Sequence, residues 1–164
     1  MNKSWIANGF TVANALFGGL SIMMSISGEY HVAAICILIA MAADAFDGRV
    51  ARALGTAGPM GVELDSLSDD ISFGVAAGAL IYSYQLRELG AFGFIPCALL
   101  GAFCAFRLAR FNVKVTSVHG YFEGLPCPTV GVIIACYVLS GVKIWNWLAM
   151  VCVLALAVLM VSEV

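Results

Sequence analysis

Residues 44–52 read DAFDGRVAR and residues 61–69 read GVELDSLSD. Both stretches lie in long apolar runs, and together they carry four carboxylates: Asp44, Asp47, Asp65 and Asp69. An ionised carboxylate in an apolar segment that spans a membrane is costly, so it marks a functional site by default. The first two aspartates are three residues apart and the last two are four apart, so each pair shares one face of a helix. A short turn separates the two helices, and we expect the four carboxylates to face one another across one polar site.

The composition is that of an integral membrane protein. Of the 164 residues, 62% are hydrophobic and 11% are charged, whereas soluble domains have about 25% charged residues. The mean hydropathy is +0.99. The first apolar run is too long for a cleaved signal peptide and is expected to be a retained span. The sequence contains no run of basic residues of the kind that would indicate nucleic-acid binding. Because a membrane helix needs about 20 apolar residues, we predict one all-α domain, residues 1–164, with six transmembrane helices over residues 9–27, 32–52, 64–84, 91–112, 126–142 and 145–162.

The basic residues predict the orientation of these spans. If the N-terminus is inside, six of the eight basic residues fall on the inner side and only Arg87 and Lys143 fall on the outer side. This asymmetry follows the positive-inside rule. We therefore predict a multi-pass protein of the cell membrane with both termini in the cytoplasm and with the aspartates near the cytoplasmic face.

The residue types around the aspartates indicate a hard divalent cation and a phosphate-bearing substrate. Carboxylate oxygens suit magnesium, manganese or calcium. Gly48, Ala51 and Gly61 leave room beside the aspartates, and Arg52 is a planar donor suited to phosphate. Two metal ions in one site can stabilise both the attacking and the leaving oxygen of an in-line displacement. The pattern favours phosphoryl-group transfer from a nucleotide.

Two other interpretations of the aspartates are open. They can serve helix–helix contacts or pair with Arg49 and Arg52, although two arginines leave two of the four carboxylates unpaired. A divalent-cation transporter also needs intramembrane aspartates, but transporters of this kind have repeated halves or broken helices, and no repeat is visible here. Asp70 lies about 100° away from the face of Asp65 and Asp69, so we expect a structural role for it. The six cysteines form no CxxC pair and are expected to pack as small apolar residues.

The spacing of the aspartates resembles the signature of the CDP-alcohol phosphotransferase family, D-x2-D-G-x2-A-R-x8-G-x3-D-x3-D. All eight specified positions are present: Asp44, Asp47, Gly48, Ala51, Arg52, Gly61, Asp65 and Asp69. The resemblance covers essentially the whole chain. It implies a six-span membrane enzyme, commonly a homodimer, that uses two divalent metal ions (Mg2+ or Mn2+) and a CDP-activated lipid of the CDP-diacylglycerol type.

The resemblance also implies a role for each aspartate. Asp44, Asp47 and Asp65 correspond to ligands of the first metal ion, and Asp44, Asp65 and Asp69 would hold the second. Asp69 also corresponds to the catalytic general base that takes the proton of the acceptor hydroxyl. The four carboxylates would thus divide metal binding and proton transfer between them.

The nucleotide contacts follow from the same resemblance. Gly48 and Arg52 match positions that contact the CDP moiety. The start of the first span is similar to the family pattern P-N-x2-T, with Ala7 where the family has proline. The residues expected to bind the CDP-lipid are therefore Asn8, Thr11, Gly48, Ala51, Arg52 and Gly61.

Three local patterns are similar to the phosphatidylserine synthase branch of the family. They are LDSLSDDISFG at residues 64–74, RLARFN at residues 107–112, and YFEGLPCP at residues 121–128, with Cys127 where serine is usual. The branch implies transfer of a phosphatidyl or archaetidyl group to the hydroxyl of L-serine, with release of CMP. The alternative acceptors, glycerol phosphate or inositol phosphate, bear a phosphate and would favour more basic residues near the site.

The acceptor itself suggests which side chains bind it. Free serine brings a carboxylate, which Arg107 or Arg110 can bind through two hydrogen bonds. These arginines are three residues apart and share a helix face, and Asn112 is a further candidate. The alternative role for both arginines is anchoring to anionic lipid headgroups. Residues 124–126 are expected to cover the site as a rigid loop, because Pro126 restricts the backbone.

Overall fold

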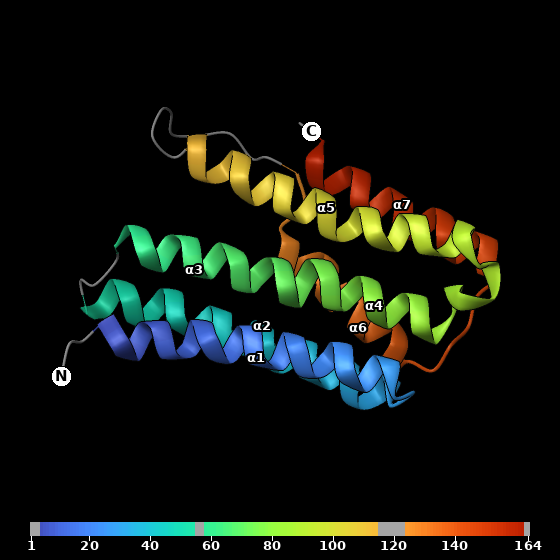
Figure 1. Ribbon diagram of the computed structural model, residues 1–164, viewed down its shortest axis with the longest axis horizontal. Coiled ribbons are helices and arrows are strands. Elements are labelled where there is room, and N and C mark those ends of the chain that lie inside the picture. The colour runs from blue at the N-terminus through green and yellow to red at the C-terminus, as the bar shows by residue number, and fades with distance from the viewer. Residues whose placement is uncertain (1–3, 55–57, 115–123, 163–164) are drawn as a thin grey trace.

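The computed structural model describes the backbone of residues 4–54, 58–114 and 124–162, and the side chains of residues 8–50, 58–113 and 124–162. Every regular element in this part of the chain is helical, which confirms the predicted all-α class (Figure 1). The helices run roughly along the long axis of the molecule. Five of them are α1 (Ser4–Ile26), α2 (Tyr30–Leu54), α5 (Ala91–Lys114), α6 (Cys127–Leu139) and α7 (Asn146–Val161).

The remaining predicted span forms a helical rod over residues 59–84 that changes its hydrogen-bond pattern in the middle. It begins as α3 (Pro59–Asp69), continues as the π-helix η1 (Asp70–Val75) and ends as α4 (Ala76–Tyr84). Proline at the first helical position is favourable, because its missing N–H needs no partner there. A short 3-10 helix, η2 (Leu86–Leu89), follows and leads into α5.

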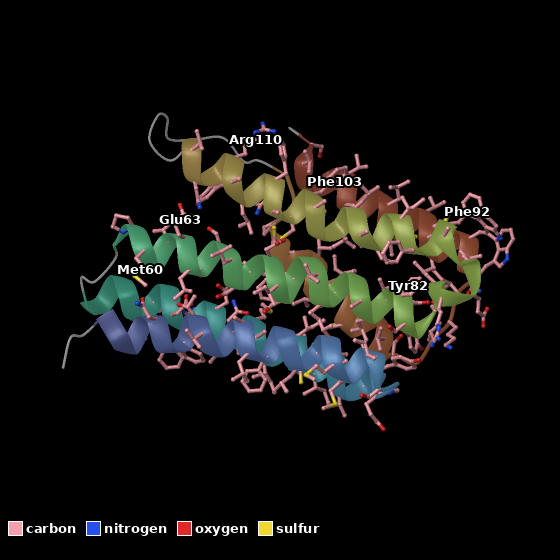
Figure 2. All side chains as sticks on the ribbon, viewed as in Figure 1. Met60, Glu63, Tyr82, Phe92, Phe103 and Arg110 are labelled. Carbon is pink, nitrogen blue, oxygen red and sulfur yellow. The ribbon has the colours of Figure 1, made fainter. Side chains whose placement is uncertain are left out.

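Within the described part of the chain, three helices are long and apolar enough to cross a membrane. The apolar segments are Asn8–Ile26, Tyr30–Val50 and Ala91–Val113. The helices α6 and α7 are apolar but shorter, and the rod over residues 59–84 is divided by its π-helical segment. Large apolar side chains also project from the outer faces of the helices along their length (Figure 2). These features fit a membrane protein, and the number of spans stays a prediction.

The π-helix η1 lies at the centre of the packing. The helix α1 packs along α2, α5 packs along α7, and η1 contacts α1, α5 and α6. Phe73 of η1 is completely buried, as are Leu80 of α4 and Leu100 of α5. The approach of α1 to η1 requires a glycine, because a Cβ atom added at Gly18 would lie 2.9 Å from the Cα of Ser72. The residues that follow Asp69 are therefore held on several sides.

Candidate metal and active site

Three carboxylates meet between α2 and α3. One carboxylate oxygen from each of Asp44, Asp47 and Asp65 lies within 4.8 Å of the other two. The carboxyl group of Asp44 is also within hydrogen-bonding reach of Asp69. The helical spacing places two of these residues on one face of α2 and two on the facing side of α3. The structure thus brings together all four aspartates singled out from the sequence, with Asp69 at the edge of the tighter group of three.

The group of three suits a hard cation. The Oδ2 atom of Asp47 and the Oδ1 atom of Asp65 are buried and have no hydrogen-bond partner among the described residues. Buried polar atoms normally have such a partner, and carboxylates this close repel one another. A divalent cation would satisfy both oxygens and offset the repulsion. Because the donors are all carboxylate oxygens, the set fits magnesium or manganese better than zinc or copper.

Helix α1 supplies polar partners to both aspartate helices. The hydroxyl of Thr11 donates a hydrogen bond to the Asp47 carboxylate. The amide nitrogen of Asn14 donates to Oδ1 of Asp69 at 3.0 Å. Asn14 is completely buried, and its backbone carbonyl accepts a hydrogen bond from the hydroxyl of Ser72 at 2.9 Å. Helix α1 therefore fixes the aspartates from a third side.

Asn14 is a residue that reasoning from the sequence missed. The sequence feature that could have identified it is its polar side chain inside an apolar run, three residues after Thr11 and six after Asn8. That spacing continues one polar stripe along α1, since residues three apart lie on neighbouring positions of a helix face. The stripe shows that Asn14 could have been grouped with the expected nucleotide contacts, but not that it would bind an aspartate.

The expected nucleotide-binding residues lie at the same end of the bundle. Asn8 and Gly61 lie close together, because a Cβ atom added at Gly61 would lie 3.8 Å from Oδ1 of Asn8. Thr11 is buried and bonded to Asp47. Gly48 lies on α2, one residue after Asp47. The backbones of Ala51 and Arg52 continue α2, and their side chains lie outside the described part of the chain.

The contacts of Arg107, one of the two expected acceptor arginines, lead toward the aspartates. Its Nη1 atom donates to the thiol of Cys127 at 3.5 Å, and Cys127 is close enough to Asp69 to interact with it electrostatically. The Nε atom of Arg107 is buried without a partner among the described residues. The Arg110 side chain leaves α5 on the side away from α3 in the view of Figure 2. That both arginines contact the acceptor stays a prediction.

The other residues near the acceptor side connect helices. The amide nitrogen of Asn112 donates to the hydroxyl of Ser66 at 3.0 Å, which ties the end of α5 to α3. The backbone nitrogen of Leu125 donates to the carbonyl of Leu159 at 3.2 Å, so the chain before α6 is attached to the end of α7. Residues 115–123 lie outside the described part of the chain.

Asp70 belongs to a different environment from the four aspartates. Its carboxyl group faces the thiol of Cys104 on α5 and is not part of the group formed by Asp44, Asp47 and Asp65. A Cβ atom added at Gly74 would lie 2.7 Å from Oδ1 of Asp70 and 2.9 Å from Cβ of Cys104. The position of Asp70 is therefore set by close packing against α5.

Comparisons with known proteins add three findings. A sequence model of the family described as CDP-alcohol phosphatidyltransferase matches residues 4–161. The CDP-diacylglycerol–serine O-phosphatidyltransferase of Helicobacter pylori is 36% identical over 137 residues, which cover 83% of this chain and 58% of the relative. The archaetidylserine synthase of Methanothermobacter thermautotrophicus is 38% identical over 156 residues, which cover 94% of this chain and 66% of the relative.

A further relative has a length closer to that of this chain. The CDP-diacylglycerol–serine O-phosphatidyltransferase of Bacillus subtilis is 36% identical over 155 residues, which cover 94% of this chain and 85% of the relative. The first two relatives are longer proteins, of which this chain spans 58% and 66%.

Proposed function

This chain belongs to the CDP-alcohol phosphatidyltransferase family, and from that membership we propose that it transfers a phosphatidyl-type group from a CDP-activated lipid to the hydroxyl of L-serine, with release of CMP. The resemblance drawn from the spacing of the aspartates is thereby confirmed at the level of the family. The names of the relatives support serine as the acceptor and leave both phosphatidyl and archaetidyl groups as donors.

One observation carries the proposal. The carboxylates of Asp44, Asp47 and Asp65 lie within 4.8 Å of one another, and Asp69, beside them, is held by the amide of Asn14. Asp47 and Asp65 each leave a buried oxygen without a partner among the described residues, and these oxygens belong to carboxylates close enough to share one cation. The arrangement is suited to divalent cations that bind a diphosphate.

The proposed reaction needs a base for the acceptor hydroxyl, since a serine hydroxyl is a weak nucleophile at neutral pH. Asp69 would accept the proton of the serine hydroxyl while Asn14 holds the carboxylate in place. The serine oxygen would form a bond to the lipid-side phosphorus, and the bond from that phosphorus to the CMP oxygen would break. Magnesium or manganese ions held by Asp44, Asp47, Asp65 and Asp69 would supply positive charge that stabilises the diphosphate and the leaving CMP.

Arg107 is the residue we assign to the serine carboxylate. Its guanidinium contacts Cys127, which lies near Asp69, and its Nε atom is buried without a partner among the described residues. A planar guanidinium with a free donor suits a carboxylate, which it can bind through two hydrogen bonds. Arg110 and Asn112 remain expected contacts of the acceptor, and Asn8, Thr11, Gly48, Ala51, Arg52 and Gly61 remain expected contacts of the CDP-lipid.

The setting of the reaction is also proposed. We place the chain in the cell membrane as a multi-pass protein, with the aspartates and both termini on the cytoplasmic side, because the distribution of basic residues favours this orientation. The lipid tails would lie against the apolar helix surfaces while the diphosphate and cytidine reach the carboxylates. A homodimer is proposed from the resemblance to the family.

The experiment that tests the function measures CMP release. Purified protein is incubated with a CDP-lipid, Mg2+ or Mn2+, and one acceptor at a time: L-serine, glycerol phosphate or inositol phosphate. The expected result is CMP release with serine, matched by formation of a serine phospholipid in equal amount. Release with glycerol phosphate but not with serine would make the acceptor wrong, and release with none of them would make the enzyme assignment wrong.

Two variants and one further measurement sharpen this test. Asp69→Asn should abolish serine-dependent CMP release while binding of the CDP-lipid is kept. Asp70→Asn removes a neighbouring carboxylate that faces Cys104 instead, and it should keep most of the activity. Uptake of Mn2+ into liposomes that contain the protein but no CDP-lipid would instead support the transporter interpretation.

A further inference from the structure

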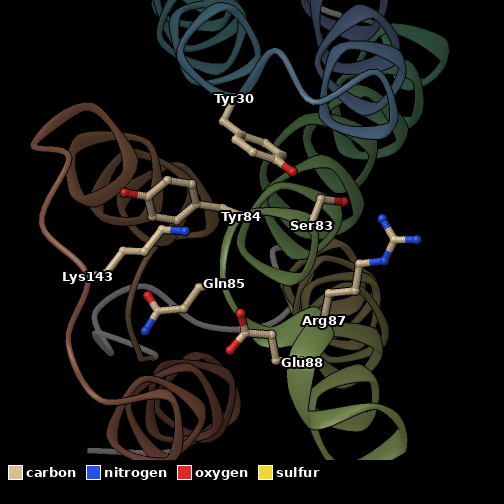
Figure 3. Close-up of a pocket in the computed structure, with 7 residues that line it drawn as sticks. All are labelled: Tyr30, Ser83, Tyr84, Gln85, Arg87, Glu88 and Lys143. Atoms are coloured by element: carbon tan, nitrogen blue, oxygen red, sulfur yellow. The ribbon is translucent and has the colours of Figure 1, made fainter.

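A second polar cavity lies at the other end of the bundle from the aspartates. It has a volume of about 410 Å³ and is lined by residues from the start of α2, the end of α4, η2 and the segment before α7 (Figure 3). Tyr30 is the first residue of α2 and Asp44 comes 14 residues later, which corresponds to about 20 Å along a helix. The cavity is therefore separate from the site built by the carboxylates.

The floor of this cavity is fixed by a network of hydrogen bonds. Gln85 is 4% exposed. Its amide nitrogen donates to the carbonyl of Ile144 and to Oδ1 of Asn146, and its amide oxygen accepts from the hydroxyl of Tyr137. The amide nitrogen of Asn146 in turn donates to Oε2 of Glu88 at 2.8 Å. The network joins the end of α4, α6 and the start of α7, so the cavity is preorganised.

The charges around the cavity favour an anionic ligand. Arg87 and Lys143 line it. Glu88 lines it too, but its carboxylate is engaged by Asn146. The ammonium of Lys143 lies over the ring of Tyr84, 4.8 Å from the centroid, which holds it at the edge of the cavity. Two cations against one carboxylate give the lining a net positive charge.

The surroundings of the cavity are those of a membrane interface. Trp145 and Trp147 are 75% and 44% exposed, and Phe92, in ring contact with Trp147, is 66% exposed. Exposed aromatic residues at helix ends are typical of the headgroup level of a bilayer. The apolar segment Tyr30–Val50 is long enough to cross a membrane, and the cavity lies at its Tyr30 end. This end of the bundle would therefore lie at the interface opposite the aspartates.

We propose that this cavity binds the headgroup of an anionic phospholipid in the leaflet opposite the aspartates, with its negative charge attracted by Arg87 and Lys143, which line the cavity on two sides. A charge-assisted hydrogen bond from either side chain to a phosphate oxygen is strong. The exposed aromatic side chains at this end of the bundle offer an apolar surface for the upper part of the acyl chains. A phosphate ion in solution has the same chemistry at the phosphate itself, but it lacks acyl chains that can pack against the exposed aromatic residues at this end of the bundle. The site is independent of the proposed catalytic function.

The test compares lipids and free phosphate on the detergent-purified protein. Bound molecules are counted by native mass spectrometry during titration with short-chain phosphatidylglycerol, short-chain phosphatidylcholine or inorganic phosphate. The expected result is one phosphatidylglycerol bound with at least about tenfold preference over phosphatidylcholine, because both lipids carry the phosphate but the choline cation of phosphatidylcholine is repelled by the net positive lining. Equal binding of the two lipids, or binding of inorganic phosphate as tight as that of phosphatidylglycerol, would overturn the proposal.

Matched variants locate the effect. The double variant Arg87→Gln/Lys143→Gln should lose the preference for phosphatidylglycerol, whereas Arg49→Gln removes an exposed cation near the aspartates and should keep it. The charge-conserving variant Arg87→Lys/Lys143→Arg should also keep it, which separates loss of charge from a failure to fold. Retention of the preference in the double glutamine variant would exclude the cavity as the site. CMP release should be unchanged in that variant, because neither residue belongs to the proposed active site. Failure of the lipid-binding proposal can therefore be told apart from failure of the proposed enzymatic function.

Discussion

The amide nitrogen of Asn14 lies 3.0 Å from Oδ1 of Asp69, across 55 positions of the sequence. Asn14 is completely buried, and its own Oδ1 atom has no partner among the described residues. A buried amide that satisfies only part of its hydrogen-bonding capacity is costly. The hydrogen bond from Asn14 holds the Asp69 carboxylate in one orientation, and this role would account for a costly buried amide at this position.

The first prediction concerns this contact. Asn14→Leu keeps the approximate size of the side chain and removes the donor, so Asp69 can rotate away from the acceptor hydroxyl. We expect kcat to fall by roughly tenfold to a hundredfold, the scale of a misplaced catalytic group, while KM for serine changes little. Steady-state CMP release at varied serine concentration measures both constants.

A variant of the same helix serves as its control. Ser21 is also buried on α1, and its hydroxyl has no partner among the described residues. Ser21→Ala should therefore leave kcat unchanged. An equal loss of kcat in both variants would show that α1 tolerates no change and that Asn14 has no special role.

The second prediction concerns the group of three carboxylates. Asp65→Asn removes one charge from a set whose oxygens lie within 4.8 Å of one another. Without metal, this variant should unfold at a higher temperature than the wild type, because repulsion is relieved. Added Mn2+ should stabilise the wild type and have little effect on the variant, as ligand linkage requires. Thermal unfolding with and without Mn2+ measures both effects.

Asp70→Asn is the matched control for the metal site. Since its carboxyl group faces Cys104 and lies outside the group of three, Mn2+ should stabilise this variant as strongly as the wild type. If Mn2+ stabilises Asp65→Asn to the same extent as the wild type, the carboxylates do not hold the ion.

The third prediction identifies the arginine that meets serine. Arg107→Lys keeps the charge but loses the planar pair of donors. We expect KM for serine to rise by about tenfold, the scale of one lost charge-assisted hydrogen bond, with KM for the CDP-lipid unchanged. Arg110→Lys should raise KM for serine less, because that side chain leaves α5 on the side away from α3. A larger effect at Arg110 would reverse the assignment.

The fourth prediction tests the packing of α1 against the π-helix with two adjacent glycines. A Cβ atom at Gly18 would lie 2.9 Å from the Cα of Ser72, whereas a Cβ atom at Gly19 would have no neighbour within 4 Å. Gly18→Ala should lower stability by about 1–3 kcal/mol, as overpacking does. Gly19→Ala should raise it slightly, since alanine favours a helix by up to about 1 kcal/mol over glycine. Thermal unfolding of both variants gives the comparison, and equal effects would contradict the observed approach.

The grouping of the aspartates could be predicted from the sequence because it depends on local geometry. The spacings of three and four residues fix which side chains share a face of α2 or α3, and the short connection between these helices brings the two faces together. The helical class could be predicted for the same reason, since long apolar runs determine it.

Contacts that depend on how helices approach one another could not be predicted in this way. The bond from Asn14 to Asp69 and the contact of Arg107 with Cys127 join elements far apart in the sequence. Spacing suggested that Arg107 and Arg110 act together, but it did not indicate which other helix each side chain would contact. The π-helix over Asp70–Val75 has no sequence pattern of its own, because such turns arise where packing outweighs regular hydrogen bonding.

That π-helix has a geometric consequence for the helical rod of residues 59–84. Each residue of an α-helix rotates the chain by about 100° around the helix axis. One extra residue in a π-helical turn therefore rotates the directions of all later side chains by about 100° relative to a regular α-helix. The half before it can therefore aim Asp65 and Asp69 at the polar site, while the half after it aims Gly78 at the backbone of Cys97 on α5. A deletion of one residue within the π-helix would remove this rotation. The rod could then direct Asp65 and Asp69 at the polar site or pack Gly78 against α5, but it could not do both.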